Sequence, residues 1–77
     1  MHNKISIIFV IYKSGDILYK NLRNLSNYEI VIIDNDHKSI IKKKVLEINS
    51  SIKYFKMKKN LGISKAVNLA FSKINNE

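Results

Sequence analysis

Two stretches of the chain end in side chains that could contact a ligand. Tyr12 follows the apolar run "ISIIFVI", and its flat ring could stack on a nucleobase or instead close the core. Asp34 ends the apolar run "EIVII", where a carboxylate could accept hydrogen bonds from ligand N–H or hydroxyl groups. The turn formers that follow, "NDHKS", leave a second interpretation open, in which Asp34 only caps a turn.

A third stretch, "KNLGISKAVNLAF", has the pattern of a turn followed by a helix. Gly62 lets the backbone approach a ligand closely, and free N–H groups at a helix start attract anions. Lys65 adds a positive charge suited to a diphosphate, and Asn60 and Asn68 add amide groups on either side of it. The alternative is a simple turn followed by a solvent-exposed lysine.

The sequence gives little support for a metal or catalytic site. Asp34 and Asp36 could together hold a hard divalent cation, but the surrounding turn formers explain this pair without metal. Cysteine is absent, and His2 and His37 are too far apart in sequence to suggest zinc. No histidine lies near a candidate nucleophile. We therefore assign no catalytic residue and no metal ligand.

The composition indicates one small folded domain. The 77 residues are 45% hydrophobic, with no proline and two glycines, which favours regular structure and short connections. The net charge of +8 comes almost entirely from lysine, whereas nucleic-acid recognition favours arginine, so we expect a solvated surface and no nucleic-acid partner. The longest apolar run, Ile5 to Tyr12, is far shorter than the ~20 residues of a membrane span. It also lacks a cleavage signal, and we expect a cytoplasmic protein.

Apolar runs alternate along the chain with segments of helical periodicity. The runs "KISIIFVIY", "YEIVIID" and "SIKYFKM" predict strands, the first two buried on both faces. Apolar residues that recur every three or four positions predict a helix after each strand, with Ser14 as the N-cap of the first. The predicted helical faces are Leu18, Leu22 and Leu25; then Ile41, Val45 and Ile48; then Ile63, Val67, Ala70 and Ile74.

This βαβαβα order predicts an α/β fold with a parallel sheet and right-handed crossovers. The carboxyl ends of parallel strands lie at one edge of the sheet, where ligands of such folds bind. Tyr12, Asp34 and the turn at Gly62 would therefore face one shared pocket. Three strands make half of a usual doubly wound domain and leave one apolar edge open. We expect residues 1–77 to be a single partial domain, either a piece of a longer protein or a protein that needs a partner.

Three motifs resemble, in order and spacing, the amino-terminal half of family 2 inverting glycosyltransferases with the GT-A fold. The motifs are "ISIIFVIYKSGDILYKNLRNL", "YEIVIIDND" and "KNLGISKAVNLAF". The family typically reads S-I-I-I-V-T-Y-N, then I-I-V-V-D-N-x-S, then N-x-G-x-x-x-A-x-N. The likeness is strongest to rhamnosyltransferase-type members that build bacterial surface polysaccharides. It implies a Rossmann-like nucleotide-binding sheet, a nucleoside-diphosphate sugar donor and a glycan acceptor.

The resemblance also implies a nucleotide site. Ile11 and Tyr12 match the Thr-Tyr that ends the first strand of the family, which places Tyr12 against the base. Asp34 matches the aspartate that hydrogen-bonds the base or the ribose. Asn60 and Gly62 match the family's loop before the third helix. Lys65 and Asn68 match positions of that helix that face the nucleotide.

The chain departs from the family pattern in ways that affect individual contacts more than the fold. Ile11 replaces a threonine, Lys13 an asparagine and Ala70 a glycine, and residues 36–38 replace small polar residues. In the family the metal-binding Asp-x-Asp and the catalytic base come later in the chain. The divalent cation, Mn²⁺ or Mg²⁺, would then be held outside these residues, and the isolated 77 residues are expected to be inactive.

By this resemblance the parent enzyme would be an inverting, hexosyltransferase-type glycosyltransferase of polysaccharide biosynthesis. It would have no transmembrane segment in this part but could associate peripherally with a membrane. The alternative is a non-catalytic nucleotide-binding or regulatory α/β module, although the acidic pair of receiver domains is absent after the first strand. A basic nucleic-acid binder is a third hypothesis, and it predicts a steep loss of affinity with added salt.

Overall fold

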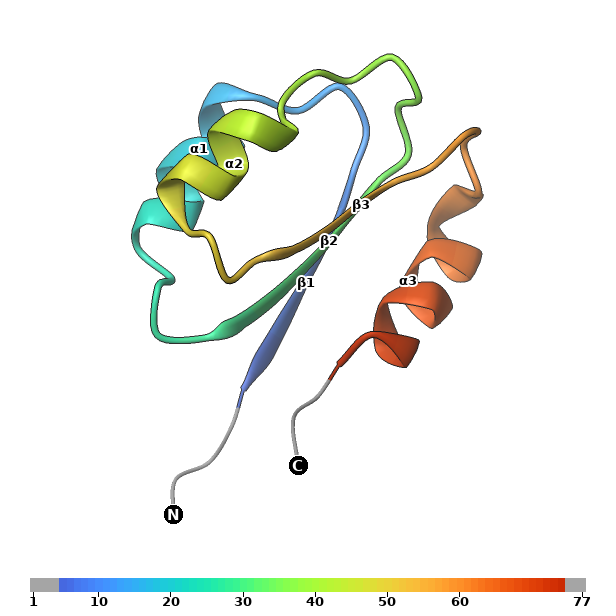
Figure 1. Ribbon diagram of the computed structural model, residues 1–77. Coiled ribbons are helices and arrows are strands. Elements are labelled where there is room, and N and C mark those ends of the chain that lie inside the picture. The colour runs from blue at the N-terminus through green and yellow to red at the C-terminus, as the bar shows by residue number, and fades with distance from the viewer. Residues whose placement is uncertain (1–4, 75–77) are drawn as a thin grey trace.

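The computed structural model describes residues 5–74, which form three strands and three helices in strict alternation. Figure 1 shows their arrangement around a single sheet. The predicted βαβαβα order is confirmed. The elements are β1 (Ser6–Ile11), α1 (Asp16–Arg23), β2 (Glu29–Asp34), α2 (Lys42–Ile48), β3 (Lys53–Lys56) and α3 (Gly62–Ser72).

The sheet is parallel throughout, in the order β1-β2-β3, with β2 in the centre. Ile11 pairs with Asp34, and Asp34 pairs with Lys56, so the three strands end in one row. Helices α1 and α2 cover one face of the sheet, and α3 covers the other (Figure 1). Because β2 has a strand on each side and helices above and below, its residues 30–33 are at most 1% exposed. This environment explains a strand sequence that is apolar without alternation.

The core beneath α1 and α2 follows the predicted helical faces. Leu18 and Leu22 of α1 and Val45 of α2 are almost fully buried against the sheet. Leu25 belongs to the same core but is only half-buried, and it lies beyond the end of α1 at Arg23. The apolar spacing therefore identified the packing residues correctly and overestimated the length of the first helix.

The start of α1 differs from the prediction. Ser14 does not cap the helix, because Gly15 occupies the N-cap position and no side chain makes a capping hydrogen bond. The first helical hydrogen bond runs from the Tyr19 amide to the Gly15 carbonyl at 3.0 Å. Asp16 in the first turn places a negative charge near the positive end of the helix.

Small residues attach α3 to the opposite face of the sheet. Ala66 and Ala70 are fully buried against Val31 and Ile33. The predicted face of α3 is therefore partly wrong, since Ile63 is 74% exposed in the first turn and Ala66 takes the buried position. The longer side chains were expected to face the sheet. Alanine allows the helix to approach the sheet more closely than isoleucine or valine would.

Within residues 5–74 the sheet has two edge strands, β1 and β3, and the apolar open edge predicted from the sequence is that of β1. β1 pairs only with β2 among residues 5–74, and its central residues 7–10 are half-buried on both faces of the sheet. Apolar side chains in this state can still accept packing partners. None of the helices within residues 5–74 has the length and apolar character needed to cross a membrane.

Candidate functional site

The loops that follow the three strands lie together at the carboxyl edge of the sheet (Figure 1). Two backbone hydrogen bonds continue the sheet beyond its last paired residues. The Asn35 amide donates to the Ile11 carbonyl at 2.8 Å, and the Met57 amide donates to the Asp34 carbonyl at 2.8 Å. The strand ends are thus fixed relative to one another, and the segments carrying Tyr12, Asp34 and Gly62 leave the sheet at the same edge.

Tyr12 is available at this edge, and the alternative in which it closes the core is wrong. The side chain is 52% exposed, whereas its neighbour Ile11 is buried in the core at 7%. Lys13 adopts a left-handed backbone conformation, with φ of 59°, which is uncommon for a residue with a side chain. Its Nζ lies 5.3 Å from the centre of the Tyr12 ring, close enough for a cation–π interaction. A flat ring and a cation therefore lie next to each other at the end of β1.

Asp34 is almost completely buried, at 1% exposure, and its carboxylate is held from two sides. Oδ1 accepts a hydrogen bond from the Asp36 amide at 3.0 Å, and Oδ2 accepts a short hydrogen bond from the Tyr54 hydroxyl. The Tyr54 oxygen also lies 3.4 Å from Ser39 Oγ. Burial, followed by the hydrogen bond to Asp34, raises the pKa of the Tyr54 phenol, so the hydroxyl keeps its proton and donates a hydrogen bond to the carboxylate.

The Asp34-Asn35-Asp36 segment forms turns, as its turn formers predict, and contact of Asp34 with a ligand stays a prediction. Besides the bond to Asp34, Asp36 Oδ1 accepts the Lys38 amide at 3.0 Å, so each aspartate stabilises the turn that follows it. No group of three His, Cys, Asp or Glu side chains within residues 5–74 is placed to hold a metal ion. These residues therefore do not fit the divalent cation that the resemblance implies.

The turn before α3 depends on two asparagines. Asn60 Oδ1 accepts the Gly62 amide at 2.8 Å, and Asn35 Oδ1 accepts the Leu61 amide at 3.1 Å. Gly62 has φ of +78°, a conformation that glycine adopts without strain. Two of the N–H groups expected to be free for an anion are therefore bonded within the protein. Asn35 was absent from the predicted site, because nothing in a run of turn formers marks one member as buried.

The two remaining predicted residues lie on α3 and face solvent. Lys65 and Asn68 are both exposed. Lys65 lies in the first turn, where a long side chain can reach the carboxyl edge. Asn68 lies six residues after Gly62, or ~9 Å further along the helix axis at 1.5 Å per residue, so it is farther from the strand ends. Contact of either residue with a nucleotide stays a prediction, as it does for Ile11, Tyr12, Asp34, Asn60 and Gly62.

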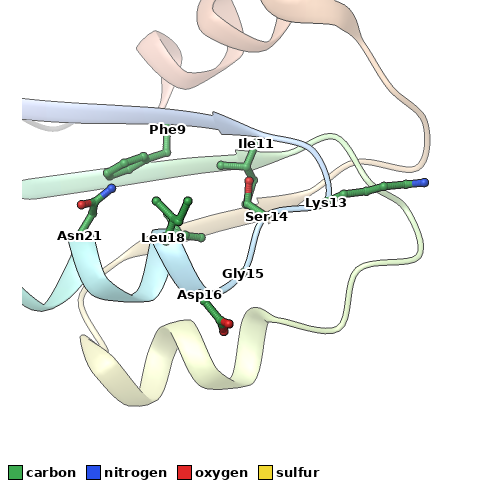
Figure 2. Close-up of a pocket in the computed structure, with 9 residues that line it drawn as sticks. Phe9, Ile11, Lys13, Ser14, Gly15, Asp16, Leu18 and Asn21 are labelled. Atoms are coloured by element: carbon green, nitrogen blue, oxygen red, sulfur yellow. The ribbon is translucent and has the colours of Figure 1, made fainter.

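A hollow of about 490 Å³ lies at the same end of the molecule, between β1 and α1. Figure 2 shows Phe9, Ile11 and Leu18 lining its apolar side, with Lys13 extending away from it. Of the seven residues predicted for the nucleotide site, only Ile11 lines it. Of the others, Tyr12 follows β1 and Asp34 ends β2. Asn60 lies in the loop before α3, which contains the remaining three. The hollow is therefore a feature of the open β1 edge rather than of the predicted site.

Comparison with known proteins agrees with this architecture. The family model for glycosyl transferase family 2 matches residues 6–77, which is nearly the whole chain. No curated protein and no solved structure gives a significant match. The three-stranded parallel sheet with its three helices is consistent with the first half of a Rossmann-like GT-A domain, as predicted. The chain belongs to glycosyl transferase family 2.

Proposed function

We propose that this chain binds the nucleotide of a nucleoside-diphosphate sugar, as the donor-binding half of a glycosyltransferase. One observation carries the proposal: a chain that matches the family over residues 6–77 brings Tyr12, Asp34 and the Asn60–Gly62 turn to one edge of its sheet. Ligands of open parallel sheets bind outside that edge. The half-exposed ring of Tyr12 is suited to a base, and the lysines beyond the strand ends are suited to phosphate.

In this proposal each predicted residue has a role. Tyr12 stacks on the base. Asp34 already accepts hydrogen bonds from the Asp36 amide and the Tyr54 hydroxyl, and it uses its remaining lone pairs to accept another from the base or ribose. Asn60 and Gly62 shape the loop beside the diphosphate, and Lys65 supplies a positive charge to it. Ile11 is buried beneath the edge and supports Tyr12. Asn68 lies further along α3 than Lys65 and adds an amide group to the nucleotide site.

The parent reaction is transfer of a sugar from the nucleotide to a glycan acceptor with inversion at the sugar carbon, in the synthesis of a bacterial polysaccharide on the cytoplasmic side of the membrane. Mn²⁺ or Mg²⁺ would neutralise the leaving diphosphate. Since residues 5–74 do not fit such an ion, its ligands and the catalytic base would come from elsewhere in the parent enzyme. We accordingly expect the 77 residues alone to bind the nucleotide without transferring sugar.

The proposal is tested by titrating the ¹⁵N-labelled chain with UDP, GDP, dTDP and ADP, with and without Mg²⁺. Saturable amide shifts are expected at residues 12–15, 34–36 and 60–62. Amides at the amino edge of the sheet, such as Ser6 and Lys53, serve as internal controls. The absence of saturable shifts with every nucleoside diphosphate would refute nucleotide binding. Tight binding to single-stranded RNA that weakens steeply with salt would instead favour a nucleic-acid function.

A further inference from the structure

The open edge of β1 is bordered by an apolar hollow on each face of the sheet. The hollow between β1 and α1, described above, includes Phe9 and Ile17 in its wall. A second hollow, of about 580 Å³, lies between β1 and α3, which covers the opposite face (Figure 1). Its lining consists of Ser6, Ile8, Phe71 and Ile74. Both faces of β1 are thus incompletely covered at the same edge.

Large apolar side chains of both helices are exposed beside this edge. Ile17 of α1 is 79% exposed, and Phe71 of α3 is 63% exposed. The side chains of β1 at positions 7–10 are themselves only half-buried. Apolar area that gathers in this way along one strand edge is typical of a surface that binds another polypeptide.

The same surface carries little charge, in a protein whose net charge is +8. β1 has no charged residue, and neither has the lining of the second hollow. Lys13 and Asp16 are the charged residues that line the first hollow, and their charges are opposite. Natural proteins commonly place lysine on an exposed edge strand to prevent pairing with another chain. An uncharged edge instead favours an uncharged apolar strand as its partner, and β1 is itself such a strand.

The backbone of β1 is arranged so that it can pair with a copy of itself. The Ile11 carbonyl accepts the Asn35 amide and therefore points towards β2. Backbone groups alternate in direction along a strand, so the N–H and C=O groups of Ile8 and Val10 point to the open edge. In an antiparallel pair, two such residues opposite each other exchange both hydrogen bonds. Ile8 of each copy can thus pair with Val10 of the other, about a two-fold axis at Phe9.

We infer that the open edge of β1 is a self-association surface, at which two copies of the chain pair their β1 strands antiparallel. The pairing joins two three-stranded sheets into one continuous sheet. Phe9 lies opposite Phe9 of the second copy, in a pair without mutual hydrogen bonds, where side chains approach most closely. The added strand covers both hollows. Contact through this edge also keeps the lysine-rich surfaces of the two copies apart. The inference does not depend on nucleotide binding.

The first test is sedimentation equilibrium of the 77-residue protein over a range of about 5 to 500 µM, at low and at high salt. A reversible monomer–dimer equilibrium is expected. The dimer should become tighter as salt is added, because salt screens the repulsion between two copies of charge +8. A chain that stays monomeric at ~500 µM overturns the inference and leaves the edge to another partner. A dimer that weakens with added salt also overturns it, since ion pairs would then hold the copies together.

Two substitutions place a lysine beside the edge, Ile17→Lys on the side of α1 and Phe71→Lys on the side of α3. Both positions are exposed, so the monomer should fold normally. Each variant should raise the dissociation constant of the dimer about tenfold or more, because the contact would enclose a charge. The matched control is Ile40→Lys, which adds the same charge at a 90% exposed isoleucine that lines neither hollow. Equal dissociation constants in the three variants would overturn the inference.

A mixture of isotope-labelled and unlabelled protein tests the pairing itself and needs no variant. Isotope-filtered NOEs should connect the Phe9 rings of the two copies at concentrations where the dimer forms. The amides of Ile8 and Val10 should exchange with solvent more slowly in the dimer than in the monomer. The amides of Tyr54 and Lys56, in the other edge strand, should exchange at nearly the same rate in both. Contacts between copies that involve β3 or α2 in place of β1 would overturn the inference.

Discussion

Replacing Tyr54 by phenylalanine tests whether the phenol supports the buried carboxylate of Asp34. The substitution keeps the aromatic ring of this buried residue, which is 8% exposed, and removes only the hydroxyl that donates to Asp34 Oδ2. A hydrogen bond to a charged group contributes about 1.5–3 kcal/mol. Asp34 is 1% exposed, so water cannot replace the lost donor without rearrangement. We expect the free energy of unfolding to fall by about 2 kcal/mol and Tm by roughly 8–16 °C.

The measurement is urea denaturation followed by circular dichroism, with Tyr19→Phe as the matched control. Tyr19 is half-buried against the same core, and no hydrogen bond of its hydroxyl is found within residues 5–74. Its loss should therefore change the unfolding free energy by less than ~0.5 kcal/mol. If Tyr54→Phe were no more destabilising than Tyr19→Phe, the hydrogen bond to Asp34 would not contribute to the stability of the site.

A pH series tests the raised pKa of the Tyr54 phenol. In the folded protein the pKa of Tyr54 is raised above its ordinary value of 10.0, first by burial and then by Asp34. Below that value the phenol is protonated in both states, and its contribution to stability is fully present. Above it the unfolded chain loses the proton while the folded chain keeps it, so stability falls as pH rises. The advantage of the unmodified protein over Tyr54→Phe should consequently shrink above pH ~10. A constant difference would contradict the raised pKa.

Three further changes test other parts of the structure. Gly62→Ala should destabilise the protein by roughly 1 kcal/mol in urea denaturation, because φ of +78° strains any residue with a side chain; an unchanged midpoint would place Gly62 in another conformation. Ala66→Leu should cost about 1–3 kcal/mol by overpacking α3 against the sheet, whereas Ile63→Ala, at a 74% exposed position, should change stability by less than ~0.5 kcal/mol. Tyr12→Ala should weaken UDP binding about tenfold or more with little change in Tm, and equal affinity would exclude stacking on this ring.

The strands and their order could be predicted from the sequence because each is a short apolar run with a helical pattern behind it. Residues 30–33 of β2 are the clearest case, since a strand covered on both faces needs no polar alternation. The helix faces were harder to predict. On α3 the structure buries Ala70, as predicted, but Ala66 takes the buried position expected for Ile63, which is 74% exposed. Periodicity predicts the spacing of the residues on a buried helix face. Which of two neighbouring faces is buried depends on how closely the helix approaches the sheet.

The candidate site could be predicted only to the level of the sheet edge. Tyr12, Asp34 and Gly62 leave the sheet where the parallel topology requires. The partners of Asp34 could not be foreseen, because Tyr54 is 20 residues away in sequence and reads as an ordinary strand residue. Asn35 was hidden for a similar reason. Its contact with Leu61 spans 26 residues, and only the packed structure distinguishes it from the other turn formers.

The structure also separates two places where a ligand could be sought at this end of the molecule. The first is the hollow of about 490 Å³ between β1 and α1. Its inner wall is formed by Phe9, Ile11 and Leu18, beside the edge of β1 that has no neighbouring strand within residues 5–74 (Figure 2). Apolar side chains at an open edge are suited to packing against another strand and offer no specific recognition of a nucleotide. The Tyr12 side of the edge has a half-exposed ring with the Lys13 cation over it. A half-exposed aromatic ring next to a cation offers a nucleotide more specific contacts than an apolar hollow does, whatever the volume of the hollow.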